Sequence, residues 1–194
     1  MRRTIRSVAA IGLVALLGAC AHPLSISPDL AVIPIQKPSV QKNAAYVITP
    51  EDRDREVTSP TGGGDSIRYF PYREMEAGLF RVLSSIYAKV TLLRSSTDKA
   101  VLDASKASYV FLPVITTEAS STSAVFWPPT DFTVTIKYQV QDATGRTVYD
   151  NEVQGKGKAT FDEYKTELGL AGRRAVEDVL KKFKEQVEKA QELK

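Results

Sequence analysis

The clearest pattern of hydrophobic and polar positions runs from Asp131 to Gln141, where apolar and polar residues alternate strictly. The apolar positions are Phe132, Val134, Ile136, Tyr138 and Val140. A period of two predicts a β-strand with one face on the core and the other in water. A turn over 142–145 follows, with Gly145 where a positive φ is useful, and residues 146–159 then return as the hairpin partner.

Three further segments predict strands because they are short, apolar and bounded by turn-forming or charged residues. They are 44–49, 90–93 and 107–117. The last contains Tyr109-Val110-Phe111-Leu112, a continuous apolar run that is typical of a strand buried on both faces. The polar stretch 95–106 is expected to contain one or two helical turns.

Two longer segments carry apolar residues at helical spacing. In 72–88 they are Met75, Leu79, Val82, Leu83 and Ile86. In a segment of about 162–191 they include Leu168, Ala171, Ala175, Val179, Phe183 and Val187. Lysine and glutamate occupy the other side of the second segment, so both segments predict amphipathic helices with one face on the core.

The predicted order is strand, helix, four strands, helix. An α+β fold buries both helical stripes most economically, as a two-layer sandwich in which one mixed or antiparallel sheet of about five strands is packed by two main helices. We assign residues 43–194 to this domain. Residues 51–66 are expected to form a flexible loop, because the run Gly62-Gly63-Gly64 lacks the spacing of a phosphate-binding fingerprint.

Residues 20–42 are rich in proline, which disfavours both helix and sheet. The prolines are Pro23, Pro28, Pro34 and Pro38. One interpretation is an extended tether, which at about 3.1 Å per residue reaches on the order of 60–70 Å. The other is an arm packed against the domain or a neighbouring subunit through apolar residues such as Leu24, Ile26 and Ile33. The sequence leaves both open.

The N-terminus has the three parts of an export signal. Three arginines open it, and the apolar stretch 8–17 is too short to span a membrane, which needs about 20 residues. Leu17-Gly18-Ala19-Cys20 then resembles a bacterial lipobox. The resemblance implies that residues 1–19 are a signal peptide and that Cys20 is the lipidation site.

The residue after Cys20 is Ala21 rather than aspartate. This segment resembles lipoproteins of enteric-type bacteria. In those proteins, a residue other than aspartate after the cysteine implies a lipid anchor on the periplasmic face of the outer membrane. Acyl chains bury about 0.8 kcal/mol per CH₂, so two or three chains give durable anchoring. The membrane, reached through acylated Cys20, is thus the first expected partner.

Loss of the signal peptide changes the charge and the chemical inventory. Of 26 basic residues, Arg2, Arg3 and Arg6 leave with it, so 23 remain against 23 acidic residues, a balance that does not indicate nucleic-acid binding. Cys20 is the only cysteine and His22 the only histidine. Thiol chemistry, a Ser-His-Asp triad and a multi-histidine metal site are therefore not expected, and neither is a cofactor.

Residues 120–131, between two predicted strands, contain a rigid aromatic-proline sequence. It consists of Phe126, Trp127, Pro128 and Pro129. Trp127 is the only tryptophan, a residue type enriched at binding hot spots, and the prolines leave little entropy to lose on binding. The functional interpretation is a partner-binding contact for a protein or the membrane surface. The structural interpretation is a loop that covers an open end of the sheet.

The overall plan resembles several groups of periplasmic lipoproteins. The matching features are Tyr109-Val110-Phe111-Leu112-Pro113, the hairpin from Ile136 to Arg146, and a final helix containing Ala171-Gly172-Arg173-Arg174. The groups are the curli-secretion lipoprotein family, the penicillin-binding-protein activator lipoproteins and the auxiliary lipoproteins of transport systems. The resemblance implies a fold but transfers no functional residue.

These observations favour a membrane-anchored periplasmic lipoprotein that is a non-catalytic structural or accessory component of a cell-envelope complex for secretion, transport or wall synthesis. Envelope proteins are its expected partners, and a homo-oligomer stays open. The alternative is a lipoprotein that binds a small ligand or glycan on the sheet face between Asp131 and Ala159, in a pocket lined by Tyr138 and Tyr149. Glu51, Asp52 and Asp54 lie in a predicted loop, so an enzyme is not expected.

Overall fold

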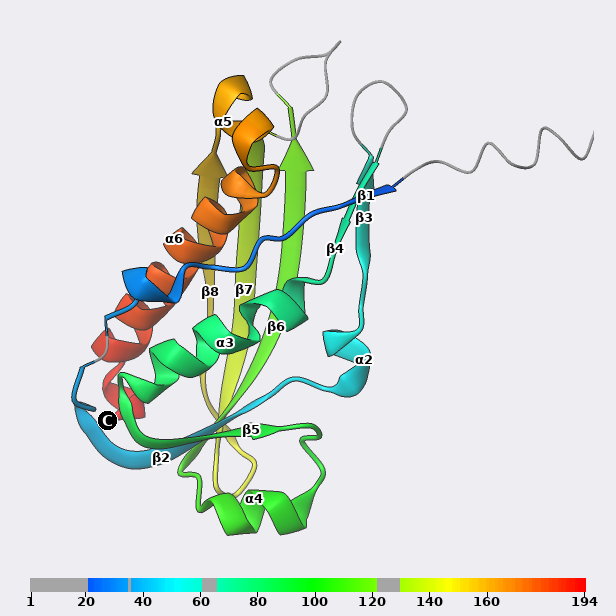
Figure 1. Ribbon diagram of the computed structural model, residues 1–194. Coiled ribbons are helices and arrows are strands. Elements are labelled where there is room, and N and C mark those ends of the chain that lie inside the picture. Colours follow the sequence, from blue (N-terminus) through cyan, green and yellow to red (C-terminus); the bar gives the residue numbers. More distant parts are fainter. Residues whose placement is uncertain (1–20, 35, 61–65, 122–129) are drawn as a thin grey trace, which may run out of the picture.

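The strands form two sheets, shown in Figure 1. The computed structural model describes residues 21–34, 36–60, 66–121 and 130–194. The larger sheet consists, in spatial order, of β5 (Tyr87–Leu93), β2 (Val40–Val47), β6 (Tyr109–Ser120), β7 (Asp131–Asp142) and β8 (Thr147–Lys158). β2 runs parallel to β5 and β6, whereas β6, β7 and β8 are antiparallel. The predicted α+β class and mixed five-stranded sheet are confirmed.

The hydrophobic patterns place the core as expected. All the apolar positions of β7 are buried on the face that carries the main core. On β6, Phe111 belongs to that core while its neighbour Val110 belongs to a second cluster on the opposite face. Gly145 has φ +83° in the turn between β7 and β8, a conformation that L side chains rarely adopt.

Two helices cover the main face of the sheet. They are α3 (Pro71–Ser84) and α6 (Leu170–Lys189). A third, α4 (Lys99–Ser105), covers part of the opposite face, where Leu102 packs against the second cluster. α3 ends before the predicted residue 88 because β5 already begins at Tyr87.

The long C-terminal helix expected over 162–191 is instead two helices. The chain forms α5 (Phe161–Thr166), becomes extended at Glu167 with φ −143° and ψ 102°, and restarts as α6. Leu168, which the spacing placed on the buried stripe, is 46% exposed. The break lets Gly169 approach the N-terminal segment, because a Cβ there would lie 1.8 Å from the carbonyl oxygen of Ser25.

Residues 51–66, predicted as a loop, contribute ordered elements. They include most of the short helix α2 (Pro50–Arg53), the strand β3 (Val57–Pro60) and the start of β4 (Ser66–Tyr69). β4 pairs antiparallel with β3 and parallel with β1 (Ala21–Pro23), which makes the smaller, three-stranded sheet. Local patterning does not reveal it because β1 lies far from its partner in sequence.

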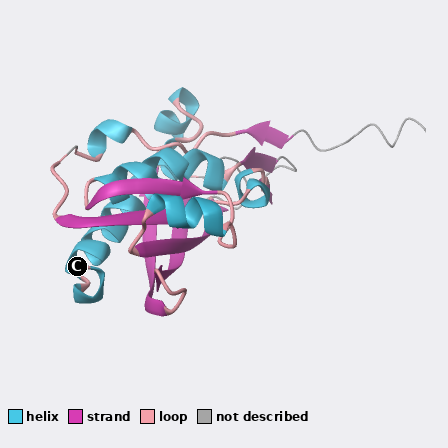
Figure 2. Cartoon of the chain, turned by 90° about the horizontal axis from the view of Figure 1, so that it is seen from below, coloured by secondary structure: helices cyan, strands magenta, loops and turns pink. Residues whose placement is uncertain are grey.

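The proline-rich segment packs against the domain. Leu24, Ile26 and Ile33 are buried, and a short 3₁₀ helix, η1 (Leu30–Val32), lies between the last two. The view from below in Figure 2 shows this arm running along the helical side of the molecule. Of the two interpretations, the packed arm describes residues 24–33, and these residues do not form an extended spacer.

Glycines make room for the arm between α3 and α6. A Cβ on Gly78 would lie 3.1 Å from Pro28, and one on Gly172 would lie 2.3 Å from Ile26. The carboxylate of Glu74, in the first turn of α3, accepts hydrogen bonds from the Ile26 amide at 2.5 Å and the Ser25 hydroxyl at 2.8 Å. These contacts fix the arm.

Candidate functional site: a groove on the outer face of α3

The site residues predicted from the sequence are outside the part of the chain that the structure describes. Cys20 directly precedes β1, and Phe126, Trp127, Pro128 and Pro129 fall within 122–129, between β6 and β7. Their predicted roles therefore stay predictions.

The pocket expected between Tyr138 and Tyr149 is absent from the described residues, because α6 fills that face of the sheet. The Tyr138 ring is 1% exposed and lies 4.8 Å, centroid to centroid, from Phe183 in an edge-to-face contact. Its hydroxyl donates to Gln186 Oε1 at 3.1 Å. Burial raises the pKa of Tyr138 well above its ordinary value, so the phenol is a hydrogen-bond donor of the core.

A groove of about 610 Å³ lies instead on the outer face of α3, the face turned away from the core. Its apolar lining includes Leu30, Tyr46, Ala77, Phe80 and Leu92, and its polar lining includes Arg73, Glu76 and Arg81. The residues come from the arm, β2, α3 and β5. We call this the α3 groove. Its volume is within the range of small-molecule and peptide sites, roughly 300–1,000 Å³.

Phe80 is the most unusual residue of the α3 groove. It is 46% exposed, although it directly follows the buried Leu79 and lies about one turn before the buried Leu83 of the same helix. Together with the apolar lining of the groove, Phe80 forms an exposed apolar patch, a feature that is common at interaction sites.

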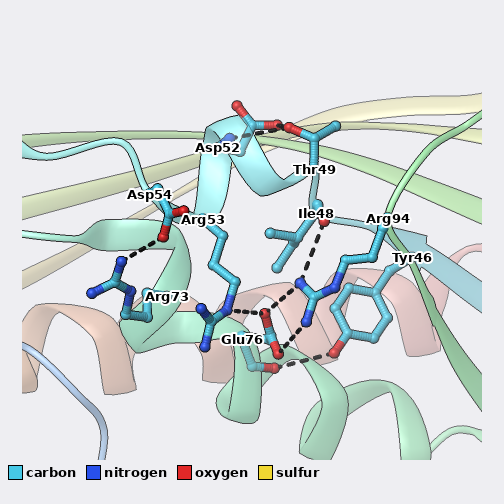
Figure 3. A network of polar contacts seen from close by, with 9 residues as sticks. All are labelled: Tyr46, Ile48, Thr49, Asp52, Arg53, Asp54, Arg73, Glu76 and Arg94. Carbon is cyan, nitrogen blue, oxygen red and sulfur yellow. Dashed lines mark hydrogen bonds and ion pairs between the residues drawn. The ribbon is translucent and has the colours of Figure 1, made fainter.

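Glu76 is the centre of an ion-pair network beside the groove (Figure 3). Its carboxylate accepts two hydrogen bonds from the Arg94 guanidinium, at 2.9 and 3.3 Å, in the bidentate arrangement that fixes both planes. Arg53 Nε lies 3.3 Å from the same carboxylate, and Arg94 also donates to the Ile48 carbonyl at 3.5 Å. α2, α3 and the end of β5 are thereby held together.

The base of this network is a buried tyrosine. The Tyr46 hydroxyl donates to the main-chain carbonyl of Glu76 at 3.4 Å. Burial raises the pKa of the Tyr46 phenol, and the negative charge of Glu76 raises it further, so the hydroxyl stays protonated. Tyr46 therefore positions α3 rather than supplying an acid or a base.

The border of the groove carries more positive than negative charge. Two arginines, Arg73 and Arg81, and one carboxylate, Glu76, line the groove, and Arg53 and Arg94 pair with that carboxylate. Arg73 pairs with Asp54 at 2.5 Å, and Arg81 Nε donates to the Ile33 carbonyl at 3.2 Å. Such an arrangement suits a ligand that is apolar along its length and carries a carboxylate.

Sequence patterning missed this site, because it is assembled from residues of four separated segments. The single available signal was Phe80 itself, which lies outside the apolar spacing of Met75, Leu79 and Val82. Among the described residues there is no group of three or more His, Cys, Asp or Glu side chains placed to hold a metal ion. None of the described helices combines the length and apolar character needed to cross a membrane.

The structure is a two-layer α+β domain, and a comparison with solved structures finds several that resemble it in part. A Xanthomonas campestris protein of the DUF330 family matches with a TM-score of 0.48 and 13% identity, over 87% of this chain and 92% of that one. A minor lipoprotein from Acinetobacter baumannii matches with a TM-score of 0.43 and 11% identity, over 75% and 91%.

A Helicobacter pylori homologue of a neuraminyllactose-binding hemagglutinin matches with a TM-score of 0.48 and 9% identity, over 82% of this chain and 89% of that one. No protein-family model matches the sequence, and a search of curated proteins finds no relative. At these identities and TM-scores the likenesses carry no inference about binding or activity.

Proposed function

We propose that this chain is a lipid-anchored, non-catalytic accessory protein of the bacterial cell envelope, which binds a partner protein of a secretion, transport or wall-synthesis complex in the α3 groove. The lipobox over Leu17–Cys20 supports the anchor, and Ala21 supports the outer membrane as its location. The chemical inventory of one cysteine and one histidine supports a binding rather than a catalytic role.

The observation that carries the proposal is an exposed Phe80 in an apolar groove bordered by arginines. We assign as occupant an extended segment of the partner, apolar at alternate positions and bearing an acidic side chain. The acidic side chain would complement the surplus of arginines around Glu76.

The two edges of the large sheet differ in a way that supports an extended occupant. Side chains of α6 satisfy the outward backbone groups of β8: Arg174 donates to the Lys158 carbonyl at 2.7 Å, and Asp178 accepts from the Lys156 amide at 2.9 Å. Within the described residues, no backbone group pairs with the outer edge of β5, whose Leu92 lines the groove. An open edge beside a groove is the arrangement that accepts an added strand.

Site-specific photo-crosslinking in intact cells tests this function. A photoreactive residue replaces Phe80, and a matched one replaces Val114, which is 52% exposed on β6 outside the groove. We expect an adduct only from position 80, and mass spectrometry should assign it to an apolar, acid-containing segment of another envelope protein. Phe80→Asp should abolish capture of that protein while the melting temperature is retained.

Three results would contradict the proposal. Equal adducts from positions 80 and 114 indicate unspecific contact, and an adduct to this same chain indicates a second copy as occupant. An adduct to a lipid or another small molecule would favour the second candidate function, a ligand-binding lipoprotein, which the groove volume of about 610 Å³ also accommodates.

A further inference from the structure

The folded domain begins at the residue directly after the proposed lipid attachment site. Ala21, the residue after Cys20, already pairs with Ser66 in the parallel ladder of β1 and β4. His22 and Pro23 continue that register, and the Leu24 amide then donates to the Arg68 carbonyl at 2.9 Å. One peptide bond therefore separates the acylated residue from the small sheet.

The chain after β1 is fixed as well. The Glu74 carboxylate holds Ser25 and Ile26, and the Asp29 amide donates to Glu177 Oε1 on α6 at 3.0 Å. Side chains of both α3 and α6 thus hold the arm in place through hydrogen bonds. Movement of the domain away from the anchor would require breaking these bonds and exposing Ile26, which is fully buried.

The same end of the molecule carries exposed apolar side chains on and beside α5. Phe161, the first residue of α5, is 55% exposed, and Leu168, just after it, is 46% exposed. Ser25 touches Gly169, and only three residues lie between Ser25 and Ala21, a span of at most about 14 Å. Figure 1 shows β1 and α5 at the upper end, opposite α4 and the C-terminus.

Lysines lie beside these apolar residues, each in an ion pair with an aspartate. Lys165 Nζ lies 4.8 Å from the centroid of the Phe161 ring and 2.7 Å from Asp162. Lys158, at the end of β8, is ion-paired with Asp131 at 2.8 Å. A lysine next to an apolar residue at an interface extends its ammonium group into the headgroups while its methylene stem stays in contact with apolar groups.

We propose that the end of the domain formed by β1, α5 and Leu168 rests on the membrane surface, with Phe161 and Leu168 entering the lipid interface. The proposal rests on the lipid attachment to Cys20 proposed above. It sets the orientation of the whole domain: α4 and the turn 142–145 point away from the bilayer. The occupant of this surface is the lipid bilayer, not a second protein.

The test uses the mature lipidated protein in vesicles of phosphatidylethanolamine and phosphatidylglycerol with brominated acyl chains. Because acylation consumes the only native thiol, a single introduced cysteine can be labelled with a fluorophore. The test variants are Phe161→Cys and Leu168→Cys. The matched control is Val101→Cys on α4, also an exposed apolar position at 42% exposure.

We expect quenching by bromine to be several-fold stronger at positions 161 and 168 than at 101, with unchanged melting temperatures. Equal quenching at all three positions, stronger quenching at 101, or none anywhere would overturn the orientation. Mass spectrometry of Cys20 in the same samples separates the two proposals. An unmodified Cys20 contradicts the anchor and this inference together, whereas an acylated Cys20 with unquenched labels contradicts the orientation alone.

Discussion

Glu163 shows how a single side chain can cap the start of one helix and link it to the next. Its carboxylate accepts from the Thr160 amide at 2.9 Å, and the Thr160 hydroxyl accepts from the Glu163 amide at 3.3 Å, which forms a capping box at the start of α5. Arg174 on α6 donates to the same carboxylate at 2.9 Å. The angle between α5 and α6, and with it the position of Leu168, depends on this carboxylate.

The pKa of Glu163 gives a prediction at this scale. The hydrogen bonds from Arg174, then that from the Thr160 amide, lower its pKa from 4.5 to about 2 in the folded protein. Because the folded pKa is the lower one, the carboxylate stabilises the fold above pH 4.5, and this contribution is lost as pH falls from 4.5 to 2. Glu163→Gln should therefore be less stable than the parent at neutral pH and equally stable near pH 2.

Urea unfolding at a series of pH values checks this difference. Glu185→Gln is the matched control, since Glu185 is an exposed glutamate further along α6. A stability gap between Glu163→Gln and the parent that stays constant from neutral pH to pH 2 would rule out the assigned role.

At the scale of elements, the contact between α6 and β8 sets the thickness of the sandwich. A Cβ on Gly157 would lie 2.0 Å from the Ala171 carbonyl oxygen, and one on Gly155 would lie 2.3 Å from that of Ala175. The helix backbone thus lies directly on the strand. This close approach also brings Arg174, Asp178 and Lys182 to the edge of β8, where Lys182 Nζ donates to the Gln154 carbonyl at 3.0 Å.

Gly157→Ala should destabilise the protein by about 1–3 kcal/mol, since the added methyl group meets backbone atoms that cannot rotate away. We also expect the α6 side chains to lose their hydrogen bonds to the edge of β8. Faster amide exchange of Lys156 would detect this loss. Lys156→Ala, which alters an exposed side chain on the same strand, should change the unfolding free energy by no more than about 0.5 kcal/mol. Equal stability of Gly157→Ala and the parent would be incompatible with this packing.

Elements with a strong internal period were predictable, and those defined by distant partners were not. The alternation of β7, the apolar run of β6 and the stripe of α3 are local properties, and the structure confirms all three. β1 and β4 are short and pair across 45 positions, from Ala21 to Ser66, so no local period marks them. The α3 groove was missed for the same reason, because Phe80, Tyr46 and Leu92 meet only after folding.

At the scale of the whole molecule, the arm replaces the long spacer that proline content favoured. Prolines disfavour regular structure, but they do not prevent burial, because Ile26 and Ile33 are both buried. Gly172 leaves room for the Ile26 side chain, and Glu74 accepts a hydrogen bond from the Ile26 amide. As a consequence, the domain is held close to the proposed lipid attachment site. The proposed membrane-facing end and the proposed partner groove on α3 are then fixed relative to the bilayer.

The anchor on Cys20 is the claim on which this arrangement depends, and mass spectrometry of the N-terminal peptide from the membrane fraction tests it most directly. We predict a mature chain that begins at Cys20 with a diacylglyceryl thioether, and an unlipidated, uncleaved precursor with an intact domain for Cys20→Ser. A mature chain that begins at another residue, or an unmodified Cys20 thiol in the membrane-bound protein, would contradict the account.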